Sequence, residues 1–175
     1  MKFNWKNRLL FGTYTYCERT VWFFLNILPK SIRKLLFKLI FGSIGKNVFI
    51  DEHCYFRYPW KIFISDNVVI NRGCNFYPSF ENSDSKIAIG NDVVIGPGVV
   101  FFGAGHAPDS TTRNNISESI EIKANAYIGG NSIIRYGVTI GENSVIGAGS
   151  VVVKDVTPFS IFAGNPAKFK KSIPQ

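Results

Sequence analysis

Branched apolar residues recur at every sixth position through the C-terminal part of the chain. They stand at Ile122, Ile128, Ile134, Ile140, Ile146 and Val152, and the residues four positions after each are Ala126, Ser132, Val138, Ser144, Ser150 and Val156. A period of six is neither the 3.6 of an α-helix nor the 2 of an isolated strand. It is typical of a chain that forms one short strand on each side of a prism and turns a corner before the next strand.

The same phase occurs earlier in the chain, in groups of three. The groups are Ile44, Ile50 and Phe56, then Ile64, Ile70 and Phe76, then Ile89, Ile95 and Phe101; their partners four positions on are Val48, Cys54, Trp60, Val68, Cys74, Phe80, Val93, Val99 and Gly105. Groups of three predict three sides per coil and five coils between Ile44 and Val156. We therefore expect an all-β solenoid over residues 44–175, in which each coil buries its apolar residues only by stacking on its neighbours.

Residues 1–43 form a separate basic, amphipathic segment that we expect to be helical. Residues 1–46 contain nine Lys or Arg and one acid, Glu18, whereas the rest of the chain contains eleven of each sign. The apolar run 21–28 ends at Pro29, and in the run 31–41 the residues Ile32, Leu35, Leu36, Leu39 and Ile40 fall on one helical face. Neither run reaches the roughly 18–20 apolar residues needed to span a bilayer.

Two interpretations of this segment stay open, and they are compatible. The apolar helix face covers the first coil as a cap, or the segment lies on an anionic membrane surface with Trp22, Phe23 and Phe24 in lipid. The three cysteines indicate a reducing compartment and no disulfide framework. We therefore expect a cytoplasmic protein with peripheral contact to the inner face of the membrane. No nucleic-acid-binding motif is present, and no nucleic-acid partner is expected.

The longest interruption of the repeat separates Phe101 from Ile122. Residues 103–121 are predicted to form an extruded loop without secondary structure, and long loops of this kind are more often functional than accidental. The loop contains His106, one of two histidines, and an imidazole can accept a proton near neutral pH. Asp109 or a backbone carbonyl would orient the ring. The second histidine, His53, lies at a hexad corner and is interpreted as structural or solvated.

Together with the repeat, five motifs resemble the hexapeptide-repeat O-acetyltransferases. The motifs are G-x-G-H-x-x-D-x-x-x-R at 103–113, YIGGNS at 127–132, GVTIGENSVIGAGSVV at 137–152, KDV at 154–156 and AGNPAK at 163–168. Over about residues 44–171 the chain is similar to the maltose, galactoside and exopolysaccharide (colanic-acid type) acetyltransferases. Residues 1–43 look more like the polysaccharide-acetylating branch of the family.

The resemblance implies a left-handed parallel β-helix that assembles as a homotrimer, with an active site in each groove between subunits. It implies acetyl-CoA as co-substrate, no metal, and a sugar hydroxyl of a surface polysaccharide or its precursor as glycan acceptor. His106 matches the family's catalytic histidine, and Asp109 and Arg113 match its loop acid and arginine. The positions that match the coenzyme A groove are Gly130, Ala148, Val153 and Lys154, and those that match the basic residues at its phosphates are Lys168 and Lys171.

Two departures from the family pattern concern the acceptor side. Tyr127 stands where the sugar acetyltransferases usually have Trp, and Ser119-Ile120-Glu121 replaces the usual Pro-Val before Ile122. We assign Asn75, Arg113 and Tyr127 to substrate binding.

Three alternatives to sugar O-acetylation differ in what they require of the sequence. The acceptor could instead be a sugar amine, serine or an antibiotic hydroxyl. A zinc hydratase of the β-helix class needs three histidines per site, and the chain has two. A non-catalytic scaffold would not require the His106 loop together with a basic C-terminal tail.

Overall fold

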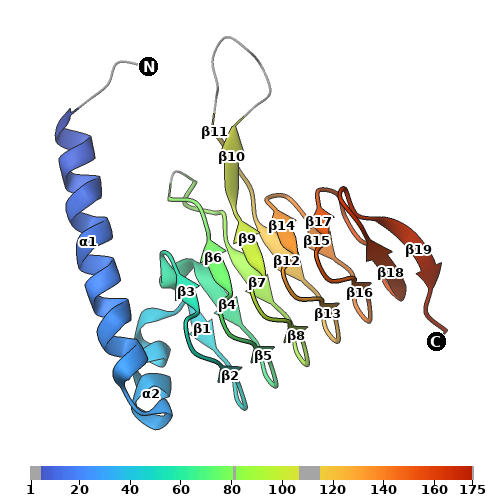
Figure 1. The fold of residues 1–175 in the computed structure, drawn as a ribbon, viewed down its shortest axis with the longest axis horizontal. Coiled ribbons are helices and arrows are strands. Elements are labelled where there is room, and N and C mark those ends of the chain that lie inside the picture. The colour runs from blue at the N-terminus through green and yellow to red at the C-terminus, as the bar shows by residue number, and fades with distance from the viewer. Residues whose placement is uncertain (1–4, 81, 107–114, 175) are drawn as a thin grey trace. The chain divides into compact units, whose positions relative to one another are not determined.

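The computed structural model describes residues 5–80, 82–106 and 115–174 (Figure 1). The chain divides into two compact units, one up to Phe37 and one from Lys38 onward. The first unit holds helix α1, Trp5–Ile27, and most of helix α2, Lys30–Ile40. Pro29 separates the two helices, and its carbonyl accepts hydrogen bonds from the amides of Ile32 and Arg33 at 3.1 and 3.0 Å.

Helices α1 and α2 pack through an aromatic contact. The rings of Trp22 and Phe37 lie 5.9 Å apart, and both side chains are buried. The prediction that Trp22 enters lipid is therefore wrong, because its ring is used between the helices. Phe23 and Phe24, by contrast, are exposed. Within the described residues, no helix combines the length and the apolar character needed to cross a membrane.

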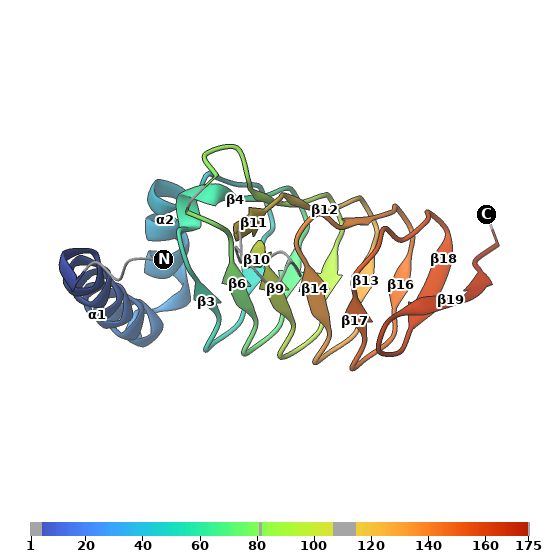
Figure 2. The same ribbon diagram turned by 90° about the horizontal axis from the view of Figure 1, so that it is seen from above.

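The second unit is a left-handed parallel β-helix of five coils, as the repeat and the resemblance predict (Figures 1 and 2). Each coil contributes one strand to each of three sheets. Sheet 1 contains β1 (Ser43–Ile44), β4 (Ile62–Ile64), β7 (Ile87–Ile89), β12 (Ile120–Ile122) and β15 (Thr139–Ile140). Sheet 2 contains β2 (Phe49–Ile50), β5 (Val69–Ile70), β8 (Val94–Ile95), β13 (Tyr127–Ile128) and β16 (Val145–Ile146). Sheet 3 contains β3 (Tyr55–Phe56), β6 (Asn75–Tyr77), β9 (Val100–Phe102), β14 (Ile133–Arg135) and β17 (Val151–Val152).

After the fifth coil the chain extends sheet 2. Strand β18 (Ser160–Ala163) pairs in parallel with β16, and β19 (Lys168–Ser172) returns antiparallel to β18. Because every coil runs from sheet 1 to sheet 2 to sheet 3, its turns also stack into columns. We call these columns the 1–2 edge, the 2–3 edge and the 3–1 edge of the prism.

The interior is filled by the residues that the period of six predicts. From Ile50 onward all of the principal repeat positions are buried, and three of them form a column of aromatic rings. Phe76 lies between Phe56 and Phe101, with ring centroids 4.7 and 4.6 Å away and interplanar angles of 13° and 11°. Such offset stacking adds to the stabilisation gained from burial. Cys54 and Cys74 are buried free thiols, as expected of small inward positions.

Trp60, Phe80 and Gly105 do not occupy the interior as their phase predicts. Trp60 is 49% exposed and Phe80 is 68% exposed, and Gly105 lies in an extruded hairpin. All three follow strands of sheet 3, at joins that are longer than in the other coils. At each of these joins the chain leaves the prism at the 3–1 edge within the four residues that follow the principal buried position. The residue that would otherwise point inward therefore lies outside the core. The 3–1 edge thus carries three consecutive insertions, which are the 3₁₀ turn η1 (Pro59–Lys61), residues 78–86 and residues 103–119.

Candidate active site

The third insertion is a β-hairpin at its base, so the prediction of a loop without secondary structure is wrong there. Strand β10 (Ala104–His106) pairs antiparallel with β11 (Asn115–Ser117), with Ala104 opposite Ser117 and His106 opposite Asn115. Backbone that leaves the sheets loses its ladder partners, and pairing of the two arms restores them. Figure 1 shows the hairpin projecting beyond the coils. His106 is exposed at the end of β10.

The hairpin leaves the β-helix at a fixed point. The amide of Gly103 donates to the carbonyl of Tyr77 at 2.8 Å, and the amide of Glu118 donates to the carbonyl of Gly103 at 3.3 Å. A Cβ at Gly103 would lie 2.9 Å from the Cα of Pro78, closer than such atoms normally approach. Only glycine therefore allows the chain to pass this close to the preceding coil.

Tyr136 supports the arm that carries His106. Its ring occupies the space into which a Cβ at Gly105 would point. The guanidinium of Arg135 lies 4.2 Å from the centre of the ring and donates to the Tyr136 hydroxyl at 2.7 Å. Sequence reasoning missed both residues, because the same Arg-Tyr pair occurs as Arg57-Tyr58 after strand β3 and nothing in the local sequence distinguishes the two.

Two of the four residues matched to the coenzyme A groove, Gly130 and Ala148, lie on the 2–3 edge. Gly130 and Ala148 are neighbours in consecutive coils, since the amide of Gly149 donates to the carbonyl of Gly130 at 2.9 Å. Ala148 is exposed, and a Cβ at Gly149 would meet nothing within 4 Å. Lys168 pairs with Ala163 of β18, whose Cβ lies beside Gly147. An extended ligand could therefore run past small residues toward the exposed lysines of β19.

The other predicted site residues lie elsewhere. Tyr127 is exposed on sheet 2, and Lys171 pairs with Ile161 farther along β18. Val153 and Lys154 follow β17 at the 3–1 edge, the edge that also carries His106. Asn75 begins β6, where its side-chain amide donates to the carbonyl of Gly73 at 2.8 Å. Asp109 and Arg113 lie outside the described residues, so their roles stay predictions.

The predicted coenzyme A groove residues are divided between two edges of one chain. Gly130 and Ala148 belong to the 2–3 edge, whereas Val153 and Lys154 belong to the 3–1 edge, together with His106. Sheet 3 separates His106 from Gly130 and Ala148.

Comparisons with known proteins identify the family. Residues 119–154 match the family described as bacterial transferase hexapeptide (six repeats). A galactoside O-acetyltransferase of Escherichia coli (strain K12) is 37% identical over 147 residues, which span 81% of this chain and 68% of that protein. This chain belongs to the hexapeptide-repeat acetyltransferases.

Two solved structures show the same fold. A maltose O-acetyltransferase from Clostridium difficile 630 superposes with a TM-score of 0.82 at 33% identity, covering 95% of this chain and 89% of that one. A hexapeptide-repeat-containing acetyltransferase from Vibrio cholerae O1 biovar eltor, complexed with acetyl coenzyme A, superposes with a TM-score of 0.79 at 29% identity. The match covers 90% of this acetyltransferase and 86% of the Vibrio chain.

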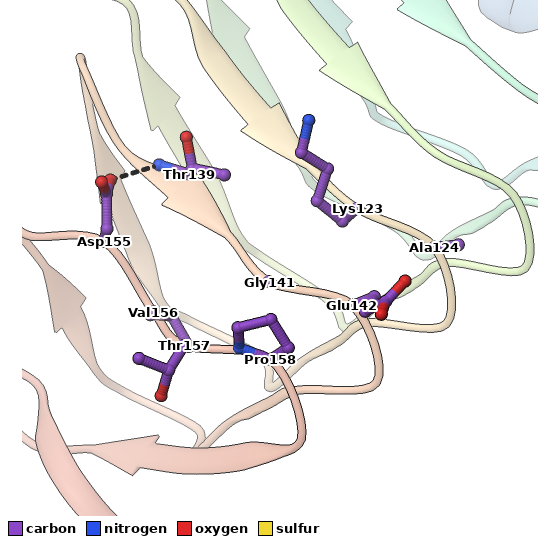
Figure 3. Close-up of a pocket in the computed structure, with 9 residues that line it drawn as sticks. All are labelled: Lys123, Ala124, Thr139, Gly141, Glu142, Asp155, Val156, Thr157 and Pro158. Carbon is purple, nitrogen blue, oxygen red and sulfur yellow. Dashed lines mark hydrogen bonds between the residues drawn. The ribbon is translucent and has the colours of Figure 1, made fainter.

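A cavity of about 720 Å³ lies at the 1–2 edge and on the outer face of sheet 1 (Figure 3). In this cavity Asp155 accepts a hydrogen bond from the Thr139 amide at 2.7 Å. Lys123 pairs with Glu121 at 2.6 Å, and this hydrogen bond lowers the pKa of the Glu121 carboxyl. The described residues that line it include none of the predicted site residues of the acetyltransferase. Among the described residues, no three metal-ligating side chains cluster.

We predict that Gly105→Ala lowers the kcat of the acetyltransferase about tenfold or more, because the added methyl group collides with the Tyr136 ring and displaces the arm that holds His106. Steady-state kinetics with a sugar acceptor measures the loss. The double variant Gly105→Ala/Tyr136→Ala removes the collision and is expected to recover activity relative to Gly105→Ala alone. A single variant with wild-type kcat would contradict the positioning role of this contact.

Proposed function

We propose that the protein transfers the acetyl group of acetyl-CoA to a hydroxyl group of a sugar, and that the acceptor is a surface polysaccharide or its precursor. The observation that carries the proposal is the exposed His106 on an extruded hairpin of a β-helix. The named activities of the galactoside and maltose relatives support it. A different acceptor, such as a sugar amine, serine or an antibiotic hydroxyl, would use the same donor and base.

The proposed reaction is a direct transfer. His106 accepts the proton of the acceptor hydroxyl while its oxygen attacks the thioester carbonyl. A C–O bond forms, the C–S bond breaks, and the proton leaves with the thiol of coenzyme A. Because the enzyme holds both substrates side by side in the orientation for attack, the acetyl group does not need to pass through a covalent intermediate with the enzyme. A backbone N–H of the groove would stabilise the oxyanion, a contribution worth about 10²–10³ in rate.

The chain offers suitable groups for coenzyme A. Exposed Ala148 and Gly149 leave room for an extended pantetheine arm, and nothing lies where a Cβ of Gly149 would project. Lys154, Lys168 and Lys171 are exposed and would meet the phosphates. Since Gly130 and Ala148 lie on a different edge from His106, we also propose that the active unit is a homotrimer in which a neighbouring subunit completes the site. The reaction is proposed to take place in the cytoplasm.

The roles of His106 and Lys168 can be separated by experiment. His106→Ala is expected to lower kcat by about 10²–10⁴ while coenzyme A still raises the melting temperature. Lys168→Glu is expected to abolish that thermal shift, because it removes a phosphate contact. His53→Asn is the matched control: the position has a φ of 59°, which asparagine tolerates, and its activity should be normal. Unchanged turnover in His106→Ala would eliminate this residue as the base.

We propose in addition that the N-terminal helices bind the anionic surface of a membrane as a peripheral contact. Leu35 and Leu39 of α2 are 64% and 76% exposed, and Lys34 and Lys38 are exposed beside them. Apolar residues flanked by lysines are typical of interfacial helices. The alternative is that this face covers other protein surface as a cap.

The double variant Leu35→Asp/Leu39→Asp is expected to lose binding to vesicles that contain phosphatidylserine, because two carboxylates then face the anionic surface. Co-sedimentation measures binding, and vesicles of phosphatidylcholine alone are the control for charge. If the wild-type protein does not sediment, or the variant sediments equally while its melting temperature falls, the cap is the correct assignment.

A further inference from the structure

The 3–1 edge carries a second feature beside the His106 hairpin. The two earlier insertions place Trp60 and Phe80 in consecutive coils, and both aromatic side chains are largely exposed. They border a cavity of about 420 Å³. Its other lining residues include Phe63, Ser83, Asp84 and Lys86. A volume of this size is that of a small-molecule pocket.

The cavity has ordered walls. Buried Tyr58 contacts both exposed rings, with its centroid 5.5 Å from that of Trp60 and 5.5 Å from that of Phe80. The ammonium group of Lys61 donates to the carbonyls of Ser79 and Asn82 and so fastens residues 79–82 to η1. On the opposite side, the ammonium of Lys86 lies 5.7 Å from the centre of the Phe63 ring.

The cavity is connected to the arm of the hairpin that pairs with His106. The side-chain amide of Asn82 donates to the carbonyl of Ser117 in β11 at 3.0 Å. The amide of Lys86 donates to the hydroxyl of Ser119 at 3.1 Å. Phe80 and residues 83–86 therefore border the cavity, while Asn82 and Lys86 also support the base of the hairpin. A ligand in the cavity lies on the same edge of the prism as the proposed base, one coil earlier.

The lining has the composition that suits a sugar ring. Aromatic faces offer apolar contact to the C–H face of a pyranose, while a carboxylate, a hydroxyl and an ammonium group can bond to its hydroxyls. The carboxylate of Asp84 disfavours a phosphorylated ligand at the same place. Of the two lysines in the lining, Lys61 already donates to the carbonyls of Ser79 and Asn82, and Lys86 supplies the ammonium group that can meet a sugar hydroxyl.

We propose that this cavity is a binding subsite for a second sugar residue of the acceptor, next to the residue whose hydroxyl is acetylated. The inference rests on the proposed function and deepens it: the preferred acceptor is an oligosaccharide or polysaccharide chain that lies along the 3–1 edge. Trp60 and Phe80 hold the additional sugar and thereby position the chain at His106.

The test compares acetyl transfer to single sugars with transfer to di- to hexasaccharides of galactose, glucose and N-acetylglucosamine. The wild-type enzyme is expected to have a higher kcat/KM for at least one oligosaccharide than for its single sugar. In Trp60→Ala and in Phe80→Ala the ratio of the two values should fall about tenfold, mainly through KM. Phe49→Ala is the matched control, because Phe49 is an exposed aromatic residue on sheet 2; it should keep the wild-type ratio.

A second experiment measures oligosaccharide binding independently of acetyl transfer. Oligosaccharide binding without acetyl-CoA is followed by tryptophan fluorescence, and Phe80→Ala, which keeps all three tryptophans, should abolish the signal. If the wild-type protein binds the oligosaccharide and Phe80→Ala does not, the subsite is supported. This holds even if the wild-type protein transfers no acetyl group, a result that would contradict the proposed function but not the subsite. The subsite is overturned if the wild-type protein neither binds nor prefers any oligosaccharide, or if both variants keep the preference. A change of oligomeric state in both variants would instead assign the cavity to contact between subunits.

Discussion

No coil of this β-helix has a core of its own, and each must bury its inward residues against the coils above and below. The column of Phe56, Phe76 and Phe101 makes this dependence visible, since the central ring is sandwiched at 4.7 and 4.6 Å. Stacking fixes the register of every strand, because a slip of one residue would turn inward side chains to the surface. Any additional residue must therefore leave the prism at an edge.

This constraint concentrates function at the edges. The three insertions all leave at the 3–1 edge, so η1, residues 78–86 and the His106 hairpin lie in consecutive coils. Hydrogen bonds from Asn82 and Lys86 join the second insertion to the third. The small residues Gly130 and Ala148 lie on another edge. A rigid prism thus holds the residues of different edges at a fixed spacing.

The period of six predicts the coils and the buried positions, since one inward residue per side is a strict geometric requirement. It also leads to the prediction of His106 as the base, because this histidine lies in the longest interruption of the repeat. The period cannot show at which residue an insertion leaves the prism, and for this reason it wrongly predicts Trp60 and Phe80 in the interior. The contact of Tyr136 with Gly105 joins residues of different coils, and no local pattern encodes it. The pairing of β10 with β11 is local, but the sequence between Phe101 and Ile122 has no alternation of apolar and polar residues that would indicate two strands. In the N-terminal helices, amphipathic spacing could not show that Trp22 faces Phe37 and not the surface.

The central claim is that His106 of one subunit acts on a thioester held by the neighbouring subunit, and subunit mixing tests it most directly. His106→Ala lacks the base, and Ala148→Trp fills the exposed groove position; each homotrimer is expected to be inactive. After the two proteins are unfolded together and refolded in equal amounts, every mixed trimer should contain one site with both intact halves. Recovery of about a quarter of wild-type activity is the expected result. If the refolded mixture is as inactive as its two components, His106 and the groove belong to the same subunit and the account is wrong.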